Sequence, residues 1–214
     1  WEDEFKKNAT HDRCFENADG SGSTVPMLYQ MGMHHVFEAT DGTLLLEKPY
    51  KGGDMSMWLM LPPAGSDPGE ALDGMQEALT VQMLHHHMTQ ARQSQSVKVG
   101  LLLPRFETRF RKEIKKQLQA MGMKRAFDAQ QADFSRMAST DEPLFIGLVV
   151  HEAFVRVDEK GTVAAAATAV SMAGGGKPQY IPFEADRPFV YFITDNRTDA
   201  ILFLGSVNKL DGAA

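Results

Sequence analysis

The chain has 214 residues, a hydrophobic content of 43% and a formal net charge of -6. This hydrophobic content excludes a disordered chain, and the length allows one sizeable core. The acidic balance argues against nucleic acid or an anionic membrane as the main partner. Because Cys14 is the single cysteine, no internal disulfide can form, so packing must stabilise the fold.

The chain opens with "WEDEFKKNATHDRCF", without an initiator methionine or a signal peptide. Trp1 and Phe5 are typical of the end of an apolar element, so we expect a fragment whose upstream part is missing. Residues 43–63 predict two strands around a turn at Lys51, Gly52, Gly53 and Asp54, and two prolines end the second strand.

Helices are expected in two places. Over residues 70–91, apolar side chains recur three or four positions apart, which predicts one or two helices. Residues 96–104 predict a strand. Residues 111–122 then place Ile114, Leu118 and Met121 on one helical face, and Gly122 is a suitable helix stop.

The C-terminal third is rich in strand signals. Residues 144–157 are apolar in both strand phases, which predicts a central strand that is covered on both faces. Residues 187–194 and 200–207 predict a final hairpin of buried strands around "DNRTD".

Between these strands lies "DEKGTVAAAATAVSMAGGG", which begins at residue 158 and contains mostly small side chains. Its alanines favour a helix, but three glycines follow and no bulky apolar stripe could dock such a helix. A strand is the alternative, although so small a strand packs poorly by ordinary standards. Small side chains do suit a segment that slides between two strands already paired.

Several segments together resemble the serpins, in the order expected for that family. "HEAFVRVDEKGTVAAAATAV" resembles the last central-sheet strand and the hinge of the reactive-centre loop, and "FEADRPFVYFITDNRTDAILFLGSV" resembles the C-terminal signature. "LEKPYKGGDMSMWLMLP", "LPRFETRFRKEIKKQLQAMGMKRAF" and "ADFSRM" match the segments before them. The resemblance implies an α+β fold with several sheets, one serpin domain over 1–214 that is its C-terminal part, and a hinge and reactive-centre loop at 158–182.

The resemblance implies inhibition of a serine endopeptidase, or of a cysteine endopeptidase, rather than enzyme activity. The protease would cut the exposed loop and form an acyl-enzyme, and the cut loop would then insert into the central sheet as a new strand. No residue of this chain is then catalytic and no cofactor is required. The expected partner is a serine protease. The small residues of this chain around the expected cut suggest an elastase-like or subtilisin-like protease. An extracellular or secreted protein is also implied.

Site residues follow from the resemblance one by one. The hinge would comprise Glu159, Gly161, Thr162, Ala164, Ala165, Ala166, Ala167 and Thr168. The usual spacing from Glu159 places the cut after about Gly175. Because loop lengths vary, the reactive site is expected within Met172, Ala173, Gly174, Gly175, Gly176 and Lys177.

His151 lies in strand phase with Val149, Ala153 and Val155. By itself such a histidine is typical of a satisfied core residue. The resemblance implies instead a role where the central sheet opens.

A metal site at residues 85–87 with His34 and His35 is disfavoured, because adjacent helical histidines diverge and no cysteine or carboxylate lies at ligand spacing. Two alternatives to inhibition stay open. The glycine-rich loop centre leaves room for a non-inhibitory binding or chaperone protein whose loop is cut without trapping. The fragment itself could also be inactive and self-associate through unpaired strand edges.

Overall fold

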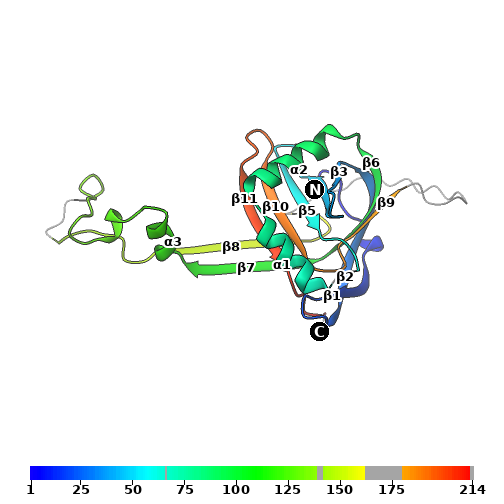
Figure 1. The fold of residues 1–214 in the computed structure, drawn as a ribbon, viewed down its shortest axis with the longest axis horizontal. Helices are drawn as coiled ribbons and strands as arrows, with labels where there is room; N and C mark the ends of the chain where they lie inside the picture. The colour runs from blue at the N-terminus through cyan, green and yellow to red at the C-terminus, as the bar shows by residue number, and fades with distance from the viewer. Residues whose placement is uncertain (66, 139–141, 162–179, 213–214) are drawn as a thin grey trace, which may run out of the picture. The chain divides into compact units, whose positions relative to one another are not determined.

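The computed structural model describes residues 1–65, 67–138, 142–161 and 180–212 (Figure 1). These residues divide into two compact units. The first unit combines Trp1–Phe106 with Arg156–Ala214, and the second consists of Glu107–Val155. The predicted reactive site, residues 172–177, and the predicted hinge residues from Thr162 to Thr168 lie outside the described residues.

The first unit contains a four-stranded sheet in the order β1-β2-β6-β9. Strand β2 is antiparallel to both of its neighbours, β1 and β6, whereas β9 is parallel to β6. A short 3-10 helix, η1 (Lys7–Ala9), precedes this sheet. Its strands are β1 (His11–Glu16), β2 (Gly22–His34), β6 (Val97–Pro104) and β9 (Ile181–Glu184).

A five-stranded antiparallel sheet in the order β11-β10-β5-β4-β3 forms the rest of the first unit's strand framework. Its central strand, β5, pairs with β10 on one side and with β4 on the other. Every residue of β10 but the last is buried. The strands are β3 (Val36–Glu38), β4 (Leu44–Pro49), β5 (Met55–Leu61), β10 (Phe189–Asp195) and β11 (Ile201–Val207).

Two of the predicted strand pairs are confirmed. The turn between β4 and β5 falls at residues 51–54, where Gly52 and Gly53 both have positive φ angles of 94° and 75°. Residues with a Cβ atom rarely adopt such φ angles, so the glycine pair determines the position of the turn. The predicted strand at 96–104 is β6, and the hairpin around "DNRTD" is β10 and β11.

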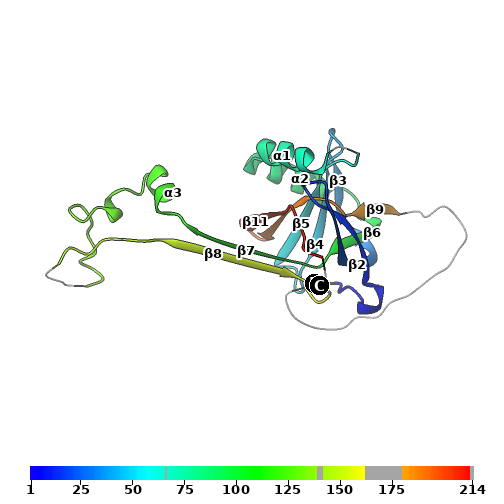
Figure 2. The same ribbon diagram turned by 90° about the horizontal axis from the view of Figure 1, so that it is seen from below.

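Residues 70–91 lie in two helices, α1 (Pro68–Ala78) and α2 (Val81–Gln93). Asp67 caps α1 by accepting hydrogen bonds from two backbone N–H groups, and Thr80 caps α2 in the same way with one. Both helices lie against one face of the five-stranded sheet (Figure 2). They share with it a hydrophobic core of Leu45, Trp58, Met60, Leu72, Met75, Leu84, Met88, Ala91, Val190 and Phe192.

Strands β7 (Phe106–Glu113) and β8 (Val150–Val157) form a two-stranded sheet, and most of this sheet lies in the second unit. A short helix, α3 (Lys115–Ala120), follows β7, and a 3-10 helix, η2 (Arg125–Phe127), follows α3. The predicted helix at 111–122 is therefore too long, because its first three residues continue β7. Met121 is 83% exposed and does not share the half-buried face of Ile114 and Leu118. Gly122, with φ 103°, does end the helix.

The prediction of a covered central strand over 144–157 is wrong for this structure. Only residues 150–157 form a strand, and Val150 and Phe154 are 44% and 45% exposed. Within the described ranges, β8 pairs with β7 and with no other strand. A strand with apolar residues on both faces is expected to be covered by a layer on each face. The described residues form neither of these layers over β8.

The prediction that both final strands are buried is correct for the first strand and wrong for the second. β10 is buried, but β11 is the edge strand of its sheet, and Leu202, Phe203 and Leu204 are 49%, 40% and 51% exposed. An apolar sequence alone cannot distinguish a central strand from an edge strand whose outer face is uncovered. None of the helices in the described part of the chain is long and apolar enough to cross a membrane.

Two glycines in α1 have different surroundings, and substituting each of them tests how these surroundings affect the stability of the protein. A Cβ atom on Gly74, inside α1, would meet no atom within 4 Å, whereas one on Gly69 would lie 2.5 Å from the Ala18 carbonyl oxygen. We expect Gly74→Ala to raise the free energy of unfolding by about 0.5–1 kcal/mol, because glycine is a poor residue inside a helix. Gly69→Ala should lower it. Urea unfolding of both variants measures the two changes, and a loss of stability in Gly74→Ala would contradict this packing.

Candidate functional site

The candidate site is the turn at residues 158–161, directly after β8, which we call the hinge base. The Asp158 side chain accepts a hydrogen bond from the Lys160 N–H at 2.9 Å, and the Asp158 carbonyl accepts one from the Gly161 N–H at 3.2 Å. An aspartate that binds the backbone two residues later is typical of a tight turn. Gly161 has φ 84°, in the left-handed region that favours glycine.

Trp1, although distant in sequence, binds the hinge base through two hydrogen bonds. Its indole Nε1 donates to the Asp158 carbonyl at 3.0 Å, and its backbone nitrogen donates to the Lys160 carbonyl at 3.0 Å. The Trp1 ring is buried and stacks on Tyr50, with 4.8 Å between ring centroids. A Cβ atom on Gly161 would lie 2.5 Å from the Trp1 nitrogen. Glycine is therefore required at this position for two independent reasons.

Glu159 carries the strongest polar contacts of the hinge base. Glu159 is 6% exposed. One of its carboxylate oxygens accepts a hydrogen bond from Arg105 at 2.6 Å and another from the Thr10 hydroxyl at 3.1 Å. The Glu159 carbonyl also accepts the Phe5 N–H at 2.9 Å. Burial alone would raise the pKa of Glu159, but its hydrogen bonds with its own backbone, Arg105 and Thr10 outweigh burial and lower it. The carboxylate is therefore charged at neutral pH.

The hinge base thus joins three distant parts of the chain. Residues 1–10 contribute Trp1, Phe5 and Thr10, and Arg105 follows β6 directly. The sequence predicted Glu159 and Gly161 as hinge residues, and both lie here. It did not predict Arg105 or Tyr50 as site residues, because no local pattern indicates a contact across so many positions.

His151 lies on β8, in the second unit. Its side chain is exposed, and its ring centroid lies 6.1 Å from that of Phe110 on the paired strand β7. The interpretation of His151 as a buried core histidine is therefore wrong for this structure. Its role in sheet opening stays a prediction.

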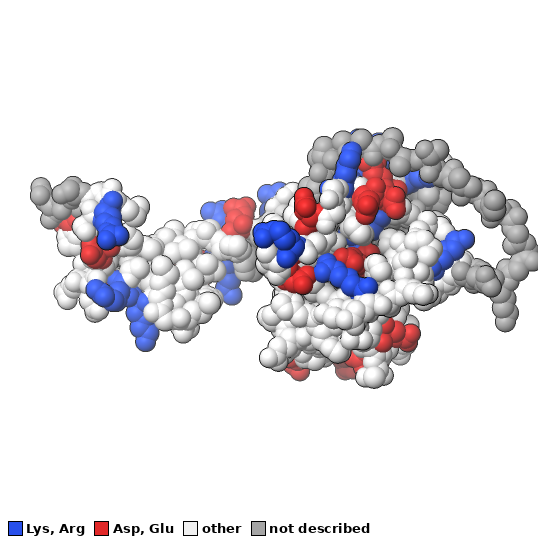
Figure 3. Space-filling model, turned by 90° about the horizontal axis from the view of Figure 1, so that it is seen from above, with Lys and Arg blue, Asp and Glu red and all other residues white. Residues whose placement is uncertain are grey.

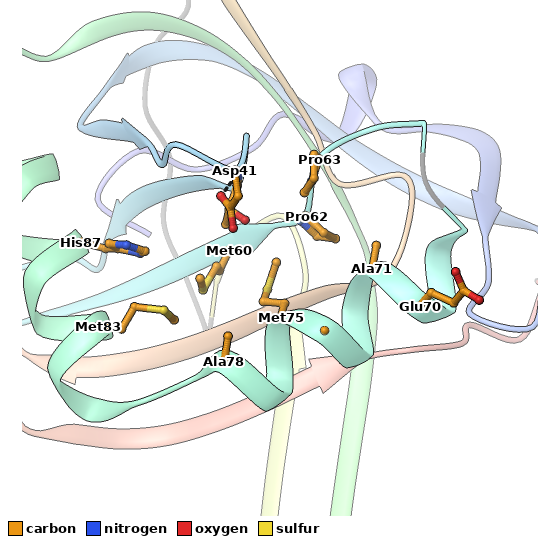
Figure 4. Close-up of a pocket in the computed structure, with 12 residues that line it drawn as sticks. Asp41, Met60, Pro62, Pro63, Glu70, Ala71, Met75, Ala78, Met83 and His87 are labelled. Atoms are coloured by element: carbon orange, nitrogen blue, oxygen red, sulfur yellow. Dashed lines mark hydrogen bonds between the residues drawn. The ribbon is translucent and has the colours of Figure 1, made fainter.

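A separate cavity of about 220 Å³ lies between the two core helices and the sheet (Figure 4). The side chains of Met60, Met75 and Met83 point toward it, and His87 and Asp41 lie at its margin. Burial lowers the pKa of His87. The cavity shares no residue with the hinge base.

On the face drawn in Figure 3, basic and acidic side chains lie next to one another, without a broad patch of either sign. Interspersed charges of both signs do not form the continuous basic surface that phosphate backbones require. This face gives no support to a nucleic-acid partner.

Comparison with known proteins gives a consistent result. Residues 1–210 match the family described as Serpin (serine protease inhibitor). The chain is 35% identical over 208 residues to leukocyte elastase inhibitor A of Rattus norvegicus and 32% identical over 209 residues to antithrombin-III of Homo sapiens. These alignments cover 97% of this chain but 54% and 44% of the two relatives. The chain therefore spans about half the length of the curated relatives it matches.

Solved structures agree with the sequence relatives. The native thermophilic serpin tengpin superimposes with a TM-score of 0.78 and 28% identity, over 98% of this chain and 52% of tengpin. Uncleaved ovalbumin gives a TM-score of 0.79 and 28% identity, over 98% of this chain and 51% of ovalbumin. The mixed sheets, the solved structures and the family match together show a serpin fold of α+β type. This chain belongs to the serpin family.

The ion pair at the hinge base should contribute measurably to stability. Arg105→Gln leaves the buried Glu159 carboxylate without its cation, and we expect a loss of about 1–2 kcal/mol in the free energy of unfolding, because the arginine is partly solvated. Arg197→Gln is the matched control, since the side chain of Arg197 is 83% exposed and 3.9 Å from Asp195. This control should change stability by less than about 0.5 kcal/mol.

The same pair should give stability a pH dependence. Because the pKa of Glu159 is lowered from its ordinary value of 4.5, its contribution is present above that value and is lost as pH falls through the folded pKa. The difference between the wild type and Arg105→Gln should therefore shrink as the pH falls below 4.5. Urea unfolding at several pH values measures it, and a difference that is constant with pH would contradict the assignment.

Gly161→Ala tests the close approach of Trp1. Both Gly161 and Gly20 have positive φ angles, 84° and 76°, but a Cβ atom on Gly20 would meet nothing within 4 Å. We expect Gly20→Ala to cost about 1 kcal/mol from backbone strain alone, and Gly161→Ala to cost clearly more. Thermal unfolding compares the two variants. Equal losses would show that Trp1 does not constrain the hinge base.

Proposed function

We propose that the complete protein inhibits a serine endopeptidase by acting as its suicide substrate. The observation that carries this proposal is the hinge base, where β8 ends in a turn anchored through Glu159 and Gly161, directly before the run of small residues at 162–168. The family description and the names of several relatives, such as leukocyte elastase inhibitor, support it. In this mechanism the protein supplies a substrate and a moving strand, and no catalytic group.

The reaction has two stages. The protease serine attacks the scissile carbonyl of the loop, the peptide C–N bond breaks, and the new amine leaves while an ester joins loop and protease. The N-terminal part of the cut loop then inserts next to β8. Insertion there suits β8, because its second edge is unpaired among the described strands and a new strand could pair with it.

The small residues after the hinge base suit this insertion. Ala164, Ala165, Ala166 and Ala167 demand little space between strands, and the hydroxyl groups of Thr162 and Thr168 are small enough to bury when they find partners. We place the scissile bond within Met172, Ala173, Gly174, Gly175, Gly176 and Lys177. The small side chains there favour an elastase-like or subtilisin-like protease, and Pro178 disfavours cleavage after Lys177.

A second candidate is a non-inhibitory binding or chaperone protein whose loop is cut without trapping. The glycines at 174–176 favour it, because glycine offers a protease little specificity. The extracellular location implied by the resemblance stays a prediction.

The 214-residue chain by itself is expected to be inactive and to self-associate. Strands of two copies could pair through the edge of β8 that has no partner among the described strands, and through the exposed apolar residues of β11. For this reason the inhibition experiment uses the complete gene product.

The complete protein should form a covalent complex with its target. We would mix it with elastase-like, trypsin-like and subtilisin-like proteases and analyse the mixtures on a denaturing gel. A band at the summed mass is expected with at least one protease, and mass spectrometry should locate the cut within residues 172–177. Clean cleavage of the loop with fully active protease would contradict inhibition and favour the binding or chaperone function.

Thr162→Arg separates cleavage from trapping in the same assay. A charged side chain at the start of the inserting segment would have to be buried without a partner, so insertion should stall and the variant should be cut without forming the complex. Thr198→Arg, in the exposed loop between β10 and β11, is the matched control and should form as much complex as the wild type. Unchanged complex formation by Thr162→Arg would contradict insertion of this segment.

A further inference from the structure

His34, the last residue of β2, is a buried histidine where the four-stranded sheet meets the five-stranded sheet. It is 5% exposed. Its Nδ1 lies 3.2 Å from the carbonyl oxygen of Glu47 on β4. The Glu47 N–H in turn donates to the carbonyl of His35 at 3.1 Å. These two contacts join the end of β2 to β4, so the state of the His34 ring bears on the junction of the two sheets.

The contact with Glu47 determines which nitrogen of the His34 ring carries the proton. A carbonyl oxygen can only accept a hydrogen bond, so Nδ1 is the donor and Nε2 presents its lone pair. Nε2 is buried and has no hydrogen-bond partner among the described residues. It packs against Gly32, where a Cβ atom would lie 3.0 Å from it. A second proton on the ring would therefore be a buried, charged donor without an acceptor.

A neighbouring ammonium adds to this penalty. Lys48 on β4 is 1% exposed, and its Nζ donates to Gln30 Oε1 at 2.6 Å. Gln30 and His34 lie four positions apart on β2 and so belong to the same face of the strand. The positive charge of Lys48 repels a second positive charge on that face. On β6 the residue opposite His34 is Val97, which offers no compensating charge.

The remaining titratable groups near His34 do not reverse this balance. The Asp3 carboxylate, on the segment before η1, favours a charged ring, whereas His35 next to it in the chain opposes one. The Glu47 carboxylate is already paired with Arg92 on α2, at 2.9 Å. The burial of the ring and the lack of an acceptor at Nε2 therefore decide the direction of the effect.

We propose that His34 is an acid-sensitive element of the fold, because the folded chain holds it as a neutral, buried ring without an acceptor for a second proton. An exposed histidine gains that proton in mild acid. The unfolded chain therefore binds a proton that the folded chain excludes, and the free energy of unfolding falls as the pH falls. This property goes beyond the proposed function and does not depend on it.

The pKa of His34 agrees with this geometry. It is lowered from 6.5 to about 4, first by burial and then by Lys48, and the bond to Glu47 restores only part of the shift. Because the folded pKa lies below the unfolded one, the contribution of the neutral ring is fully present above the unfolded pKa of 6.5. It is lost as the pH falls from 6.5 toward 4.

Two other groups act in the same direction, so the wild-type profile alone does not isolate His34. Burial lowers the pKa of His87 on α2, and burial together with Lys48 lowers the pKa of the Trp1 amino group from 8.0. The quantity that isolates His34 is the difference in pH response between the wild type and a variant at this position.

His34→Asn is the informative variant, because the asparagine amide can donate to the Glu47 carbonyl but does not titrate. His34→Leu removes both ring nitrogens and serves as a second test. His35→Asn is the matched control, since the Nδ1 of His35 also contacts a backbone carbonyl, that of Ser94, at 3.1 Å.

Urea unfolding of the complete gene product at pH 7 and pH 5 measures the effect. The unfolding equilibrium constant of the wild type should rise at least about tenfold more over this range than that of His34→Asn or His34→Leu. His35→Asn should keep most of the wild-type response. If neither His34 variant folds, the wild-type profile decides, because an unfolding constant that does not rise between pH 7 and pH 5 contradicts the proposal.

Two results would overturn the proposal. An equal rise in the wild type and in His34→Asn would mean that the folded chain binds the proton as well as the unfolded chain does. A smaller rise in the wild type would mean that a charged His34 stabilises the fold, through the carboxylate of Asp3. No protease enters this measurement, so its failure is distinct from failure to form a covalent complex.

Discussion

The buried carboxylate of Glu159 is the interaction on which the hinge base depends. A charged group that is 6% exposed must be paired, and Arg105 and Thr10 provide its partners. This requirement brings the residue after β6 and the segment before β1 to the end of β8. The turn at residues 158–161 is thereby held in one position, directly before the segment proposed to move.

Trp1 and Lys48 connect the segment before β1 to the hinge base and to β4. Trp1 binds two carbonyls of the hinge base and leaves no room for a side chain at Gly161, so it favours this position of the turn. The Lys48 Nζ lies 5.6 Å from the centroid of the Trp1 ring and donates to the Asp3 carbonyl and to Gln30 Oε1, so it holds the segment before β1 against the two sheets.

The sequence predicted most of what local patterns determine. The β4–β5 hairpin follows from two adjacent glycines in a turn, and the two core helices follow from apolar spacing with capping residues. The predicted hinge position rests on the family resemblance and stays a prediction. The partner of Glu159 could not be predicted in this way, because Arg105 lies 54 positions away and no periodicity connects the two.

The predictions were wrong where they concerned the burial of a strand. A sequence indicates that a strand has apolar faces, but it does not show whether other layers cover them. Residues 144–157 have the composition of a strand covered on both faces, yet β8 pairs with β7 alone among the described strands. Likewise, Leu202 and Leu204 have the composition of buried positions but lie on an uncovered edge strand. Burial depends on neighbouring layers, and this chain spans about half the length of its curated relatives.

Thermal unfolding of the complete protein before and after cleavage of its loop tests the central claim most directly. If the hinge base releases residues 162–168 to form a new strand beside β8, the cleaved protein gains a full set of strand hydrogen bonds. Its Tm should then rise by about 10 °C or more. An unchanged or lower Tm after cleavage would mean that the loop stays outside the sheet, and the account of the hinge base as a release point would be wrong.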